Sequence, residues 1–404
     1  MEEIYKINQL SFNDQKSQFC LCYNSGIKTF NTNDFSEKYS SNENEFNIGS
    51  ISMASLLMEL NIAVFVGTES NQLYNNKKLV VYDLISKKEI CCTLFENKID
   101  SLRSITKYII VTLQHEIKIF SFTKSELEII KEISFPDPEI ELYEIWEKPD
   151  DISPKNFVAL VDKKEIVINS FTVISNNKWS DDDQKIKIKS SFNKIQNMFY
   201  VSKLNQLFVV DEIASYINSY DVETGKAIAY LYRGKNPGFI TSITLLNKSF
   251  LAINNLNRTI HIFNLDINNN SFSLSNYFCS YIYGEHILNA CMKIYFNELI
   301  TNKEGEFYDF DFQKKGAIIS SEPEGIELNI IAYNGYAYKL RMNFIKKKYD
   351  VIQKTKYASS KNSGIKEQNL NDEKVKGLSM YSSIFDKEKK KEDEKYVVYG
   401  DSNN

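Results

Sequence analysis

Short apolar runs alternate with polar turns along most of the chain, and these runs come in pairs. The second members of the pairs are segments rich in β-branched and aromatic residues at 26–30, 78–82, 116–120, 165–169, 216–220, 259–263 and 335–339. Each follows another apolar run after a short turn, as at 62–66, 108–111, 157–161 and 207–210. Because these residue types prefer strands, the pattern predicts a succession of β-hairpins.

The spacing of the hairpins predicts the architecture. Five of the six intervals between the listed second members are about 40 to 50 residues long, which is the repeat length of a propeller blade. A β-sandwich also has alternating strands, but it does not show this recurrence. We therefore expect an all-β protein, a seven-bladed WD40-like β-propeller over residues 1–354. The sixth interval, from Thr259 to Gly335, is much longer and leaves room for a long loop at about 266–305.

The last 50 or so residues have a different composition. From about 355 the chain is dominated by Lys, Glu, Asp, Ser and Asn, and residues 387–395 are nearly all charged. Such a segment has too little apolar surface to offset the entropy of ordering it. It predicts a disordered charged tail over 355–404. A short partner-binding motif at 381–385, Tyr-Ser-Ser-Ile-Phe, is the alternative for part of it.

Charge and composition narrow the range of functions. The 49 basic and 53 acidic residues give a net charge of −4, so no global field attracts nucleic acid, and any anion site has to be local. Six cysteines without a Cys-x-x-Cys pair and only three histidines favour neither a disulfide framework nor a metal site. No signal peptide or bilayer-spanning run is present. We expect a soluble, cytoplasmic monomer with no nucleic-acid partner.

No catalytic motif is found in the sequence. It lacks Gly-x-Ser-x-Gly, the phosphate-binding Walker loop, the dinucleotide-binding fingerprint and His-Glu-x-x-His. We therefore expect a protein that is not an enzyme and that uses no cofactor.

The most specific motif lies within 211–265. Leu231-Tyr232-Arg233-Gly234 joins two strand pairs, and the strand at 259–263 reads Thr-Ile-His-Ile-Phe. The turn before this motif ends at Gly225, a residue that can take positive φ. This arrangement resembles the PROPPINs, the phosphoinositide-binding β-propellers of autophagy, which have Phe-Arg-Arg-Gly between two blades and then a Thr-Val-His-Ile-Phe strand. Segments matching the family's first three blades occur in the same order at 10–27, 63–84 and 109–122, so the resemblance covers about 12–345.

The resemblance implies a function. A PROPPIN-like protein binds phosphatidylinositol 3-phosphate or its 3,5-bisphosphate and acts as a membrane-recruited scaffold in autophagy or endosomal trafficking. Its expected partners are phosphoinositide-containing membranes and autophagy-related proteins, and its expected location is the cytoplasm and the surface of autophagosomal precursors, endosomes or vacuoles. The alternative is a WD-repeat scaffold that has lost lipid binding, because one arginine of the family pair is Tyr232 here.

The resemblance also implies which residues bind the lipid headgroup. The family has two headgroup sites, one on each side of the arginine pair, and guanidinium groups suit them because two N–H donors match two phosphate oxygens. Carried over to this sequence, the second site consists of Arg233, Gly234, Thr241, Ser242, Asn254, Asn255, Arg258, Thr259 and His261. Arg233 takes the second arginine position, and Arg258 adds a possible second cation.

The first site is degenerate by the same comparison. Tyr232 replaces its arginine, and Asn218 replaces a second arginine on the following strand. The turn from Asp211 to Ser215 replaces a turn with a lysine in the family, and Asp211 carries the wrong charge for a phosphate ligand. We therefore expect one headgroup per chain rather than two.

The predicted long loop corresponds to the family's membrane-inserting loop between the third and fourth strands of the sixth blade. Its apolar and aromatic cluster consists of Tyr277, Phe278, Tyr281, Ile282 and Tyr283. Aromatic side chains with polar neighbours suit the headgroup boundary of a bilayer. The alternative is that part of the segment, 292–296 in particular, is an ordinary strand packed on the blade.

Overall fold

A computed structural model describes residues 7–41, 48–57, 61–106, 108–123, 126–134, 142–148, 155–162, 165–174, 178–246, 249–256, 259–266, 287–296, 299, 317–321, 326–333 and 335–357; within these, the side chains of 155, 162, 171–174 and 178–184 are not described.

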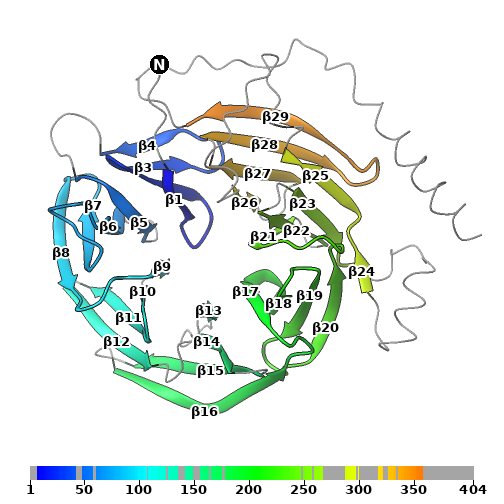
Figure 1. Cartoon of the computed structure of the whole chain (residues 1–404), viewed down its shortest axis with the longest axis horizontal. Coiled ribbons are helices and arrows are strands. Elements are labelled where there is room, and N and C mark those ends of the chain that lie inside the picture. The colour runs from blue at the N-terminus through cyan, green and yellow to red at the C-terminus, as the bar shows by residue number, and fades with distance from the viewer. Residues whose placement is uncertain are drawn as a thin grey trace, which may run out of the picture. The chain divides into compact units, whose positions relative to one another are not determined.

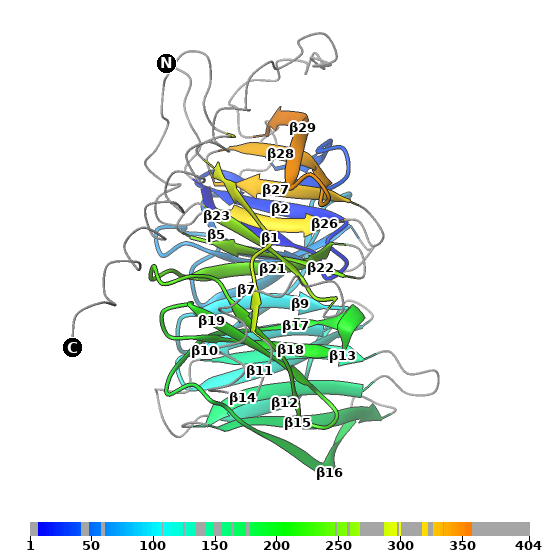
Figure 2. The ribbon, with the colours of Figure 1, turned by 90° about the vertical axis from the view of Figure 1, so that its right-hand side faces the viewer.

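Seven sheets, each with four antiparallel strands, surround a central axis, and the strands run along that axis (Figures 1 and 2). Blades 1 to 3 contain β1 (Ile7–Phe12), β2 (Gln18–Tyr23), β3 (Gly26–Asn31) and β4 (Glu37–Ser40); β5 (Ile51–Leu56), β6 (Ile62–Gly67), β7 (Lys78–Asp83) and β8 (Lys88–Leu94); β9 (Ser101–Ile105), β10 (Tyr108–Leu113), β11 (Glu116–Thr123) and β12 (Glu126–Ser134). Blades 4 and 5 contain β13 (Tyr143–Lys148), β14 (Lys155–Asp162), β15 (Glu165–Ile174) and β16 (Lys178–Lys189); β17 (Ile195–Val201), the short 3₁₀ helix η1 (Ser202–Leu204), β18 (Gln206–Asp211), β19 (Tyr216–Asp221) and β20 (Ala227–Tyr232). Blades 6 and 7 contain β21 (Ile240–Leu246), β22 (Phe250–Asn255), β23 (Thr259–Asn264) and β25 (Met292–Tyr295); β26 (Ala317–Ser321), β27 (Glu327–Ala332), β28 (Tyr336–Asn343) and β29 (Lys348–Lys356).

The prediction of a seven-bladed propeller is confirmed. All seven recurring segments are third strands of blades, namely β3, β7, β11, β15, β19, β23 and β28, and the runs before four of them are second strands. The second and third strands of a blade have a strand on each edge and a neighbouring blade on each face. Both of their faces are therefore apolar, as in β6 and β7. Outer strands such as β8 expose one face, which makes them harder to recognise in the sequence.

The predicted loop at 266–305 is wrong in its second half. Residues 292–295 form β25, the fourth strand of blade 6, as the alternative interpretation held. Three residues before it, β24 (Ile287–Asn289) pairs in parallel with β20 and adds a fifth strand to blade 5. Buried Leu288, Met292 and Ile294 explain both strands, because they pack into the apolar layers on either side of blade 6.

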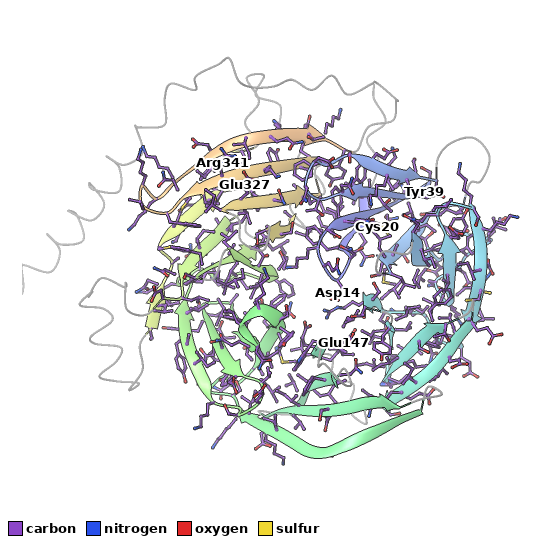
Figure 3. All side chains as sticks on the ribbon, turned by 180° about the vertical axis from the view of Figure 1, so that it is seen from behind. Asp14, Cys20, Tyr39, Glu147, Glu327 and Arg341 are labelled. Atoms are coloured by element: carbon purple, nitrogen blue, oxygen red, sulfur yellow. The ribbon has the colours of Figure 1, made fainter. Side chains whose placement is uncertain are left out.

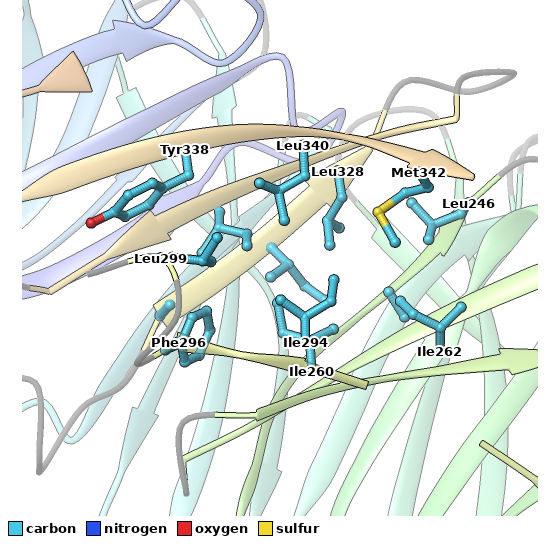
Figure 4. Packing of buried hydrophobic residues seen from close by; sticks show 14 of the residues in the cluster. Leu246, Ile260, Ile262, Ile294, Phe296, Leu299, Leu328, Tyr338, Leu340 and Met342 are labelled. Carbon is cyan, nitrogen blue, oxygen red and sulfur yellow. The ribbon is translucent and has the colours of Figure 1, made fainter. Parts of the chain in front are cut away.

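Apolar layers between the blades form the core. The layer between blades 6 and 7, shown in Figure 4, includes Ile260, Ile294, Leu328 and Leu340. The layer on the other face of blade 6 includes Ile253 and packs against blade 5. Each face of blade 6 therefore contacts a different neighbour, and a side chain's position along a strand decides which of the two interfaces it enters.

Packing between blades 7 and 1 closes the ring. Each of these blades is made of four consecutive strands, so closure depends on side chains. Phe19 and Leu21 of blade 1 pack with Ile331 and Ala337 of blade 7. The backbone N–H of Leu10 also donates a hydrogen bond of 2.9 Å to the hydroxyl of Tyr333.

Charged residues occupy the central axis, toward which Asp14 and Glu147 lie in Figure 3. The Lys16 ammonium, in the turn between β1 and β2, donates a 3.0 Å hydrogen bond to the carbonyl oxygen of Ile243 in blade 6. Burial lowers the pKa of Lys16 to about 8. Blade 1 therefore contacts blade 6 through a hydrogen bond near the central axis, in addition to its apolar packing against blade 7.

The last described strand reaches slightly beyond the expected domain boundary at 354. Strand β29 ends at Lys356, and the buried ring of Tyr357 packs against Phe19 and Phe30 of blade 1. The predicted tail, apart from these first residues, lies at 358–404, outside the described residues.

Candidate anion-binding site between blades 5 and 6

Arg233 lies where the chain leaves β20 for blade 6. Its side chain is 5% exposed, and its guanidinium donates hydrogen bonds to the carbonyl oxygens of Ala214 and Asn236. Burial lowers its pKa, and the negative charge of Asp211 opposes this shift. The guanidinium thus holds two turns together with two of its five N–H donors, and three donors remain for a ligand.

Arg233 carries a buried charge that forms no ion pair with a carboxylate of the described residues. Among the described residues it forms no ion pair within 4.0 Å, because its partners are carbonyl oxygens. Asp211 is within electrostatic range, but its Oδ1 accepts a 3.0 Å hydrogen bond from the backbone N–H of Tyr216. A buried cation without a paired anion favours the binding of an anion from solution.

His261 lies in the middle of β23 and is 4% exposed. Its Nε2 is 3.2 Å from Oγ1 of Thr259, and its Nδ1 has no hydrogen-bond partner in the part of the chain that the structure describes. Burial first, and then the positive charges of Lys293 and Arg233, lower its pKa to about 3. The imidazole is therefore neutral near pH 7 and lies within electrostatic range of two cations.

Strand register brings these groups to the same face of blade 6. Thr259 and His261 are two residues apart on β23, and Lys293 on β25 is the cross-strand partner of His261. Their face also carries Ile253, which packs against the apolar residues of blade 5. Because side chains alternate along a strand, the register points Thr259, His261 and Lys293 toward the interface that Arg233 enters from blade 5.

Asn255 and two glycines shape the connection beside this cluster. Asn255, opposite Thr259, accepts a 3.1 Å hydrogen bond at Oδ1 from the backbone N–H of Phe239. A Cβ at Gly238 would lie 2.7 Å from the Asn255 side chain, so a larger residue here would force Asn255 to shift. Gly234 has φ of +136°, a conformation that favours glycine, and the space around it is open.

Three of the carried-over residues lie at the other interface of blade 6. The amide nitrogen of Asn254 donates hydrogen bonds of 2.7 Å to Oγ1 of Thr241 and 2.5 Å to the carbonyl oxygen of Ala317 in blade 7. Ser242 is the cross-strand partner of Asn254 and shares its face. Thr241 and Asn254 therefore connect blade 6 to blade 7, and Ser242 lies on the same face without joining Arg233. Arg258 lies outside the described residues.

Lys293 is the member of the cluster that the sequence did not identify. It lies in the segment that was predicted as a loop, and a loop prediction does not indicate which side chains lie next to it. The alternation of buried Met292, Ile294 and Phe296 with exposed Lys293 and Tyr295 is the pattern of a half-buried strand. Recognising that period would have placed Lys293 on the blade.

The residues of the degenerate first site show a different arrangement. The ring of Tyr232 lies 5.0 Å from that of Tyr216, and Asn218, 1% exposed, donates a 2.8 Å hydrogen bond to Oγ of Ser191. The register of β19 places Asn218 on the same face as Tyr220, which packs against blade 4. Burial raises the pKa of Asp211, and Ser215 is buried nearby in the turn. None of these four predicted positions carries a positive charge.

The predicted membrane-insertion residues Tyr277, Phe278, Tyr281, Ile282 and Tyr283 lie outside the described residues. Within the part of the chain that the structure describes, no helix has the length and apolar composition needed to cross a bilayer.

Comparison with known proteins identifies other propellers. No family model matches the chain. Kluyveromyces lactis Hsv2 superposes with a TM-score of 0.62 at 14% identity, over 87% of this chain and 99% of that protein. KlAtg21, solved with the coiled coil of AgAtg16, gives 0.58 at 15% identity with the same coverage. Saccharomyces cerevisiae Sqt1 gives 0.54 at 9% identity, over 87% of this chain and 86% of that one.

Two of these three proteins are PROPPINs, Hsv2 and Atg21. At such low identity the likeness shows the fold alone, and Sqt1 shows that it extends beyond one group of propellers. In structure as well as in sequence motif, the chain resembles the PROPPIN β-propellers.

Proposed function

We propose that this chain is a PROPPIN-like, non-enzymatic propeller that binds one phosphoinositide headgroup between blades 5 and 6. The observation that carries the proposal is the convergence of Arg233, Thr259, His261 and Lys293 on this interface. Two cations flank a neutral imidazole there, and the buried guanidinium has no carboxylate partner within 4.0 Å among the described residues.

The cluster suits a phosphate monoester. Arg233 offers up to three further N–H donors, Lys293 offers three, and Thr259 offers a hydroxyl. A phosphate next to His261 would raise the pKa of the imidazole, because a nearby negative charge stabilises the protonated form. Its Nδ1, which has no partner in the described structure, would then become a donor to the ligand. The ligand thus supplies the negative charge that the site lacks.

The expected ligand and setting follow the family resemblance. We propose phosphatidylinositol 3-phosphate or its 3,5-bisphosphate as the ligand. The protein would act from the cytoplasm as a peripheral scaffold on autophagosomal precursor, endosomal or vacuolar membranes. The solved complex of KlAtg21 with a coiled coil of AgAtg16 supports a coiled-coil autophagy protein as a partner class. The aromatic cluster at 277–283 is proposed as a membrane-inserting element.

Flotation with lipid vesicles tests the proposal. Vesicles of phosphatidylcholine with phosphatidylinositol 3-phosphate or the 3,5-bisphosphate should carry the protein, whereas those with phosphatidylinositol should not. Lys293→Glu should reduce this binding strongly, because it reverses a charge at the site. Lys88→Glu is the matched control, since Lys88 is also an exposed lysine on the fourth strand of a blade. Equal binding to all vesicles, or equal loss in both variants, would contradict a phosphoinositide site here.

The alternative function is a protein-interaction scaffold without lipid binding. One observation favours it: Arg233 already holds two turns through Ala214 and Asn236, which is a sufficient structural reason for an arginine. The two functions separate in a titration with soluble short-chain phosphatidylinositol 3-phosphate. A lipid effector binds it with one site per chain, and a scaffold that has lost its site does not bind it.

A further inference from the structure

The hairpin between β28 and β29 in blade 7 exposes an apolar residue beside three cations. Ile345 is 96% exposed, and Lys346, Lys347 and Lys348 follow it, all exposed. We call residues 344–348 the basic hairpin tip. A single exposed apolar residue is common on protein surfaces. The informative feature here is its position at a hairpin tip directly before three exposed lysines.

The charges of the tip are not neutralised within the described structure. Further along the same hairpin, Lys339 and Arg341 share the carboxylate of Glu327 at 3.3 and 2.9 Å. Within the described part of the chain, by contrast, none of Lys346, Lys347 and Lys348 forms an ion pair. The tip therefore carries three uncompensated positive charges on a protein whose net charge is −4.

The corresponding hairpin of blade 2 has the same turn with an acidic residue in it. There Ile85 is 72% exposed and is followed by Lys87 and Lys88, but the last residue of β7 is Asp83. Asp83 accepts a 2.8 Å hydrogen bond from the backbone N–H of Ile85 and is the cross-strand partner of Lys88. In blade 7 the same turn position is Asn343.

Asn343 performs the same capping function without the charge. Its Oδ1 accepts a 3.0 Å hydrogen bond from the backbone N–H of Lys346, and it pairs across the strand with Lys348. Lys347 and Lys87 also take the same left-handed backbone conformation, with φ of 51° and 54°. The two turns are thus alike in backbone geometry, but the turn of blade 7 has one more lysine and lacks the carboxylate.

The basic hairpin tip is held firmly against blade 6. Phe344 stacks on Phe250 with ring centroids 3.8 Å apart. Burial raises the pKa of the Cys291 thiol, two residues before Lys293, and the positive charge of Lys347 opposes this shift, so Lys347 lies within electrostatic range of blade 6. Because β23 and β28 occupy the same place in neighbouring blades, their C-terminal ends open on the same face of the ring. The tip therefore projects beside the place where the chain leaves β23.

We propose that the basic hairpin tip is a second membrane contact, which docks on anionic phospholipid by inserting Ile345 at the interface and placing Lys346, Lys347 and Lys348 among the headgroups. A single protruding apolar side chain with long lysines around it suits a bilayer surface, because lysine stems can lie along the interface while their charges stay in water. A protein partner needs a larger complementary surface than one isoleucine. The inference deepens the proposed membrane function, but its ligand is bulk anionic lipid rather than the headgroup bound by Arg233.

Vesicles of phosphatidylcholine and phosphatidylserine without phosphoinositide test the inference. The protein should bind them weakly, and binding should fall as salt rises. Lys347→Gly should reduce binding on the order of fivefold, which corresponds to one lysine near a charged membrane. Asn343→Asp should reduce it similarly while keeping the cap. Lys87→Gly is the matched control and should leave binding unchanged.

Thermal unfolding shows that the losses do not come from misfolding. Glycine relieves the left-handed conformation at both positions, so Lys347→Gly and Lys87→Gly should both raise the melting temperature. The inference is overturned if wild type does not bind phosphatidylserine vesicles at low salt, which would leave a protein partner for the tip, or if both glycine variants bind equally. Soluble headgroup binding is measured in parallel. Its absence would refute the proposed function while leaving the tip's effect on phosphatidylserine vesicles intact.

Discussion

Tyr232 and Arg233 are adjacent in sequence but belong to opposite sides of blade 5. Toward blade 4, the ring of Tyr232 lies tilted against that of Tyr216, and the side-chain amide of buried Asn218 donates a hydrogen bond to Ser191. Toward blade 6, Arg233 lies within electrostatic range of His261 and carries a buried charge without a paired carboxylate in the described residues. Oδ1 of Asn218 and Oγ of Ser215 have no hydrogen-bond partner in the described residues, but the predicted positions of the first site include no cation. The second interface brings the buried guanidinium of Arg233 within electrostatic range of His261.

This difference separates a structural interface from a binding site. In the blade 4 interface the predicted site residues contact one another or their neighbours and carry no cation, so a phosphate would have to be desolvated without a charged partner in return. In the blade 6 interface the protein itself bears the cost of burying the Arg233 guanidinium, and burial together with two nearby cations lowers the pKa of His261 to about 3. A bound anion would stabilise the buried positive charge, so the blade 6 interface is the one at which binding should be tested.

Removal of the guanidinium should have the largest effect. Arg233→Gln should weaken binding of soluble phosphatidylinositol 3-phosphate by at least about tenfold, since each charged hydrogen bond contributes roughly 1.5–3 kcal/mol. It should also lower the free energy of unfolding by about 1–3 kcal/mol, because the carbonyl oxygens of Ala214 and Asn236 lose their donor. Calorimetric titration and urea unfolding measure the two effects separately.

Arg233→Lys is the control for this prediction. It keeps the charge but loses the planar pair of donors, so binding should be intermediate and still depend on salt. If Arg233→Gln is destabilised yet binds like wild type, Arg233 is only a brace between turns, and the scaffold function replaces the lipid one.

The buried imidazole should make the protein sensitive to acid. His261 has a pKa of about 3 in the folded chain and about 6.5 when unfolded, so between these values only the unfolded chain binds the proton. Stability therefore falls as pH drops below 6.5, by roughly 2 kcal/mol at pH 5 from this group. His261→Gln should remove that part of the loss.

Urea unfolding of wild type and His261→Gln at pH 7 and pH 5 measures the difference. Comparison of the two proteins subtracts the carboxylates that titrate in both. Equal losses in the two proteins would mean that His261 is protonated as easily in the folded chain as in the unfolded one. They would remove the basis for an imidazole held neutral beside two cations.

Lys293 should have a moderate effect on binding and little effect on stability. It is exposed on β25, so Lys293→Ala removes charge without leaving a cavity. Headgroup affinity should fall about two- to fivefold, as expected for an exposed charge, and the difference should shrink at high salt. Lys88→Ala on β8 should have no effect. An unchanged affinity in Lys293→Ala would place the ligand away from this edge of blade 6.

The repeat of the fold was readable from the sequence because second and third strands are apolar on both faces. The seven predicted segments are the third strands of seven blades, and Gly225 has the positive φ expected of its turn. Outer strands were harder to recognise, because half of their side chains meet solvent. The error at β24 and β25 has a different cause: β24 has only three residues, and the alternation in β25 is short and follows an aromatic-rich segment.

The residue types of the site were also readable, but their grouping was not. Asn254 and Asn255 are neighbours in sequence, yet one bonds to Ala317 in blade 7 and the other to Phe239 beside blade 5. The side chains of a strand alternate between faces, and only the pairing register assigns a face to a neighbour. Lys293 joins the cluster through a cross-strand pair 32 positions away from His261, which no local motif indicates.

The smallest effect is expected from restoring the missing arginine. Tyr232→Arg recreates the family's arginine pair in sequence, so a motif-based view predicts a second headgroup site. The structure favours the opposite outcome, because the new guanidinium would join Asn218, which is buried and hydrogen-bonded to Ser191, and would lose the contact with Tyr216. The new guanidinium would also lie near the Asp211 carboxylate, which competes with a phosphate for its positive charge. Titration of Tyr232→Arg with soluble phosphatidylinositol 3-phosphate should therefore still give one site per chain, with an affinity within about twofold of wild type. A stoichiometry of two would show that the missing arginine is the only reason why the blade 4 side binds no headgroup. The surrounding residues, such as Asn218 and Asp211, would then not prevent binding.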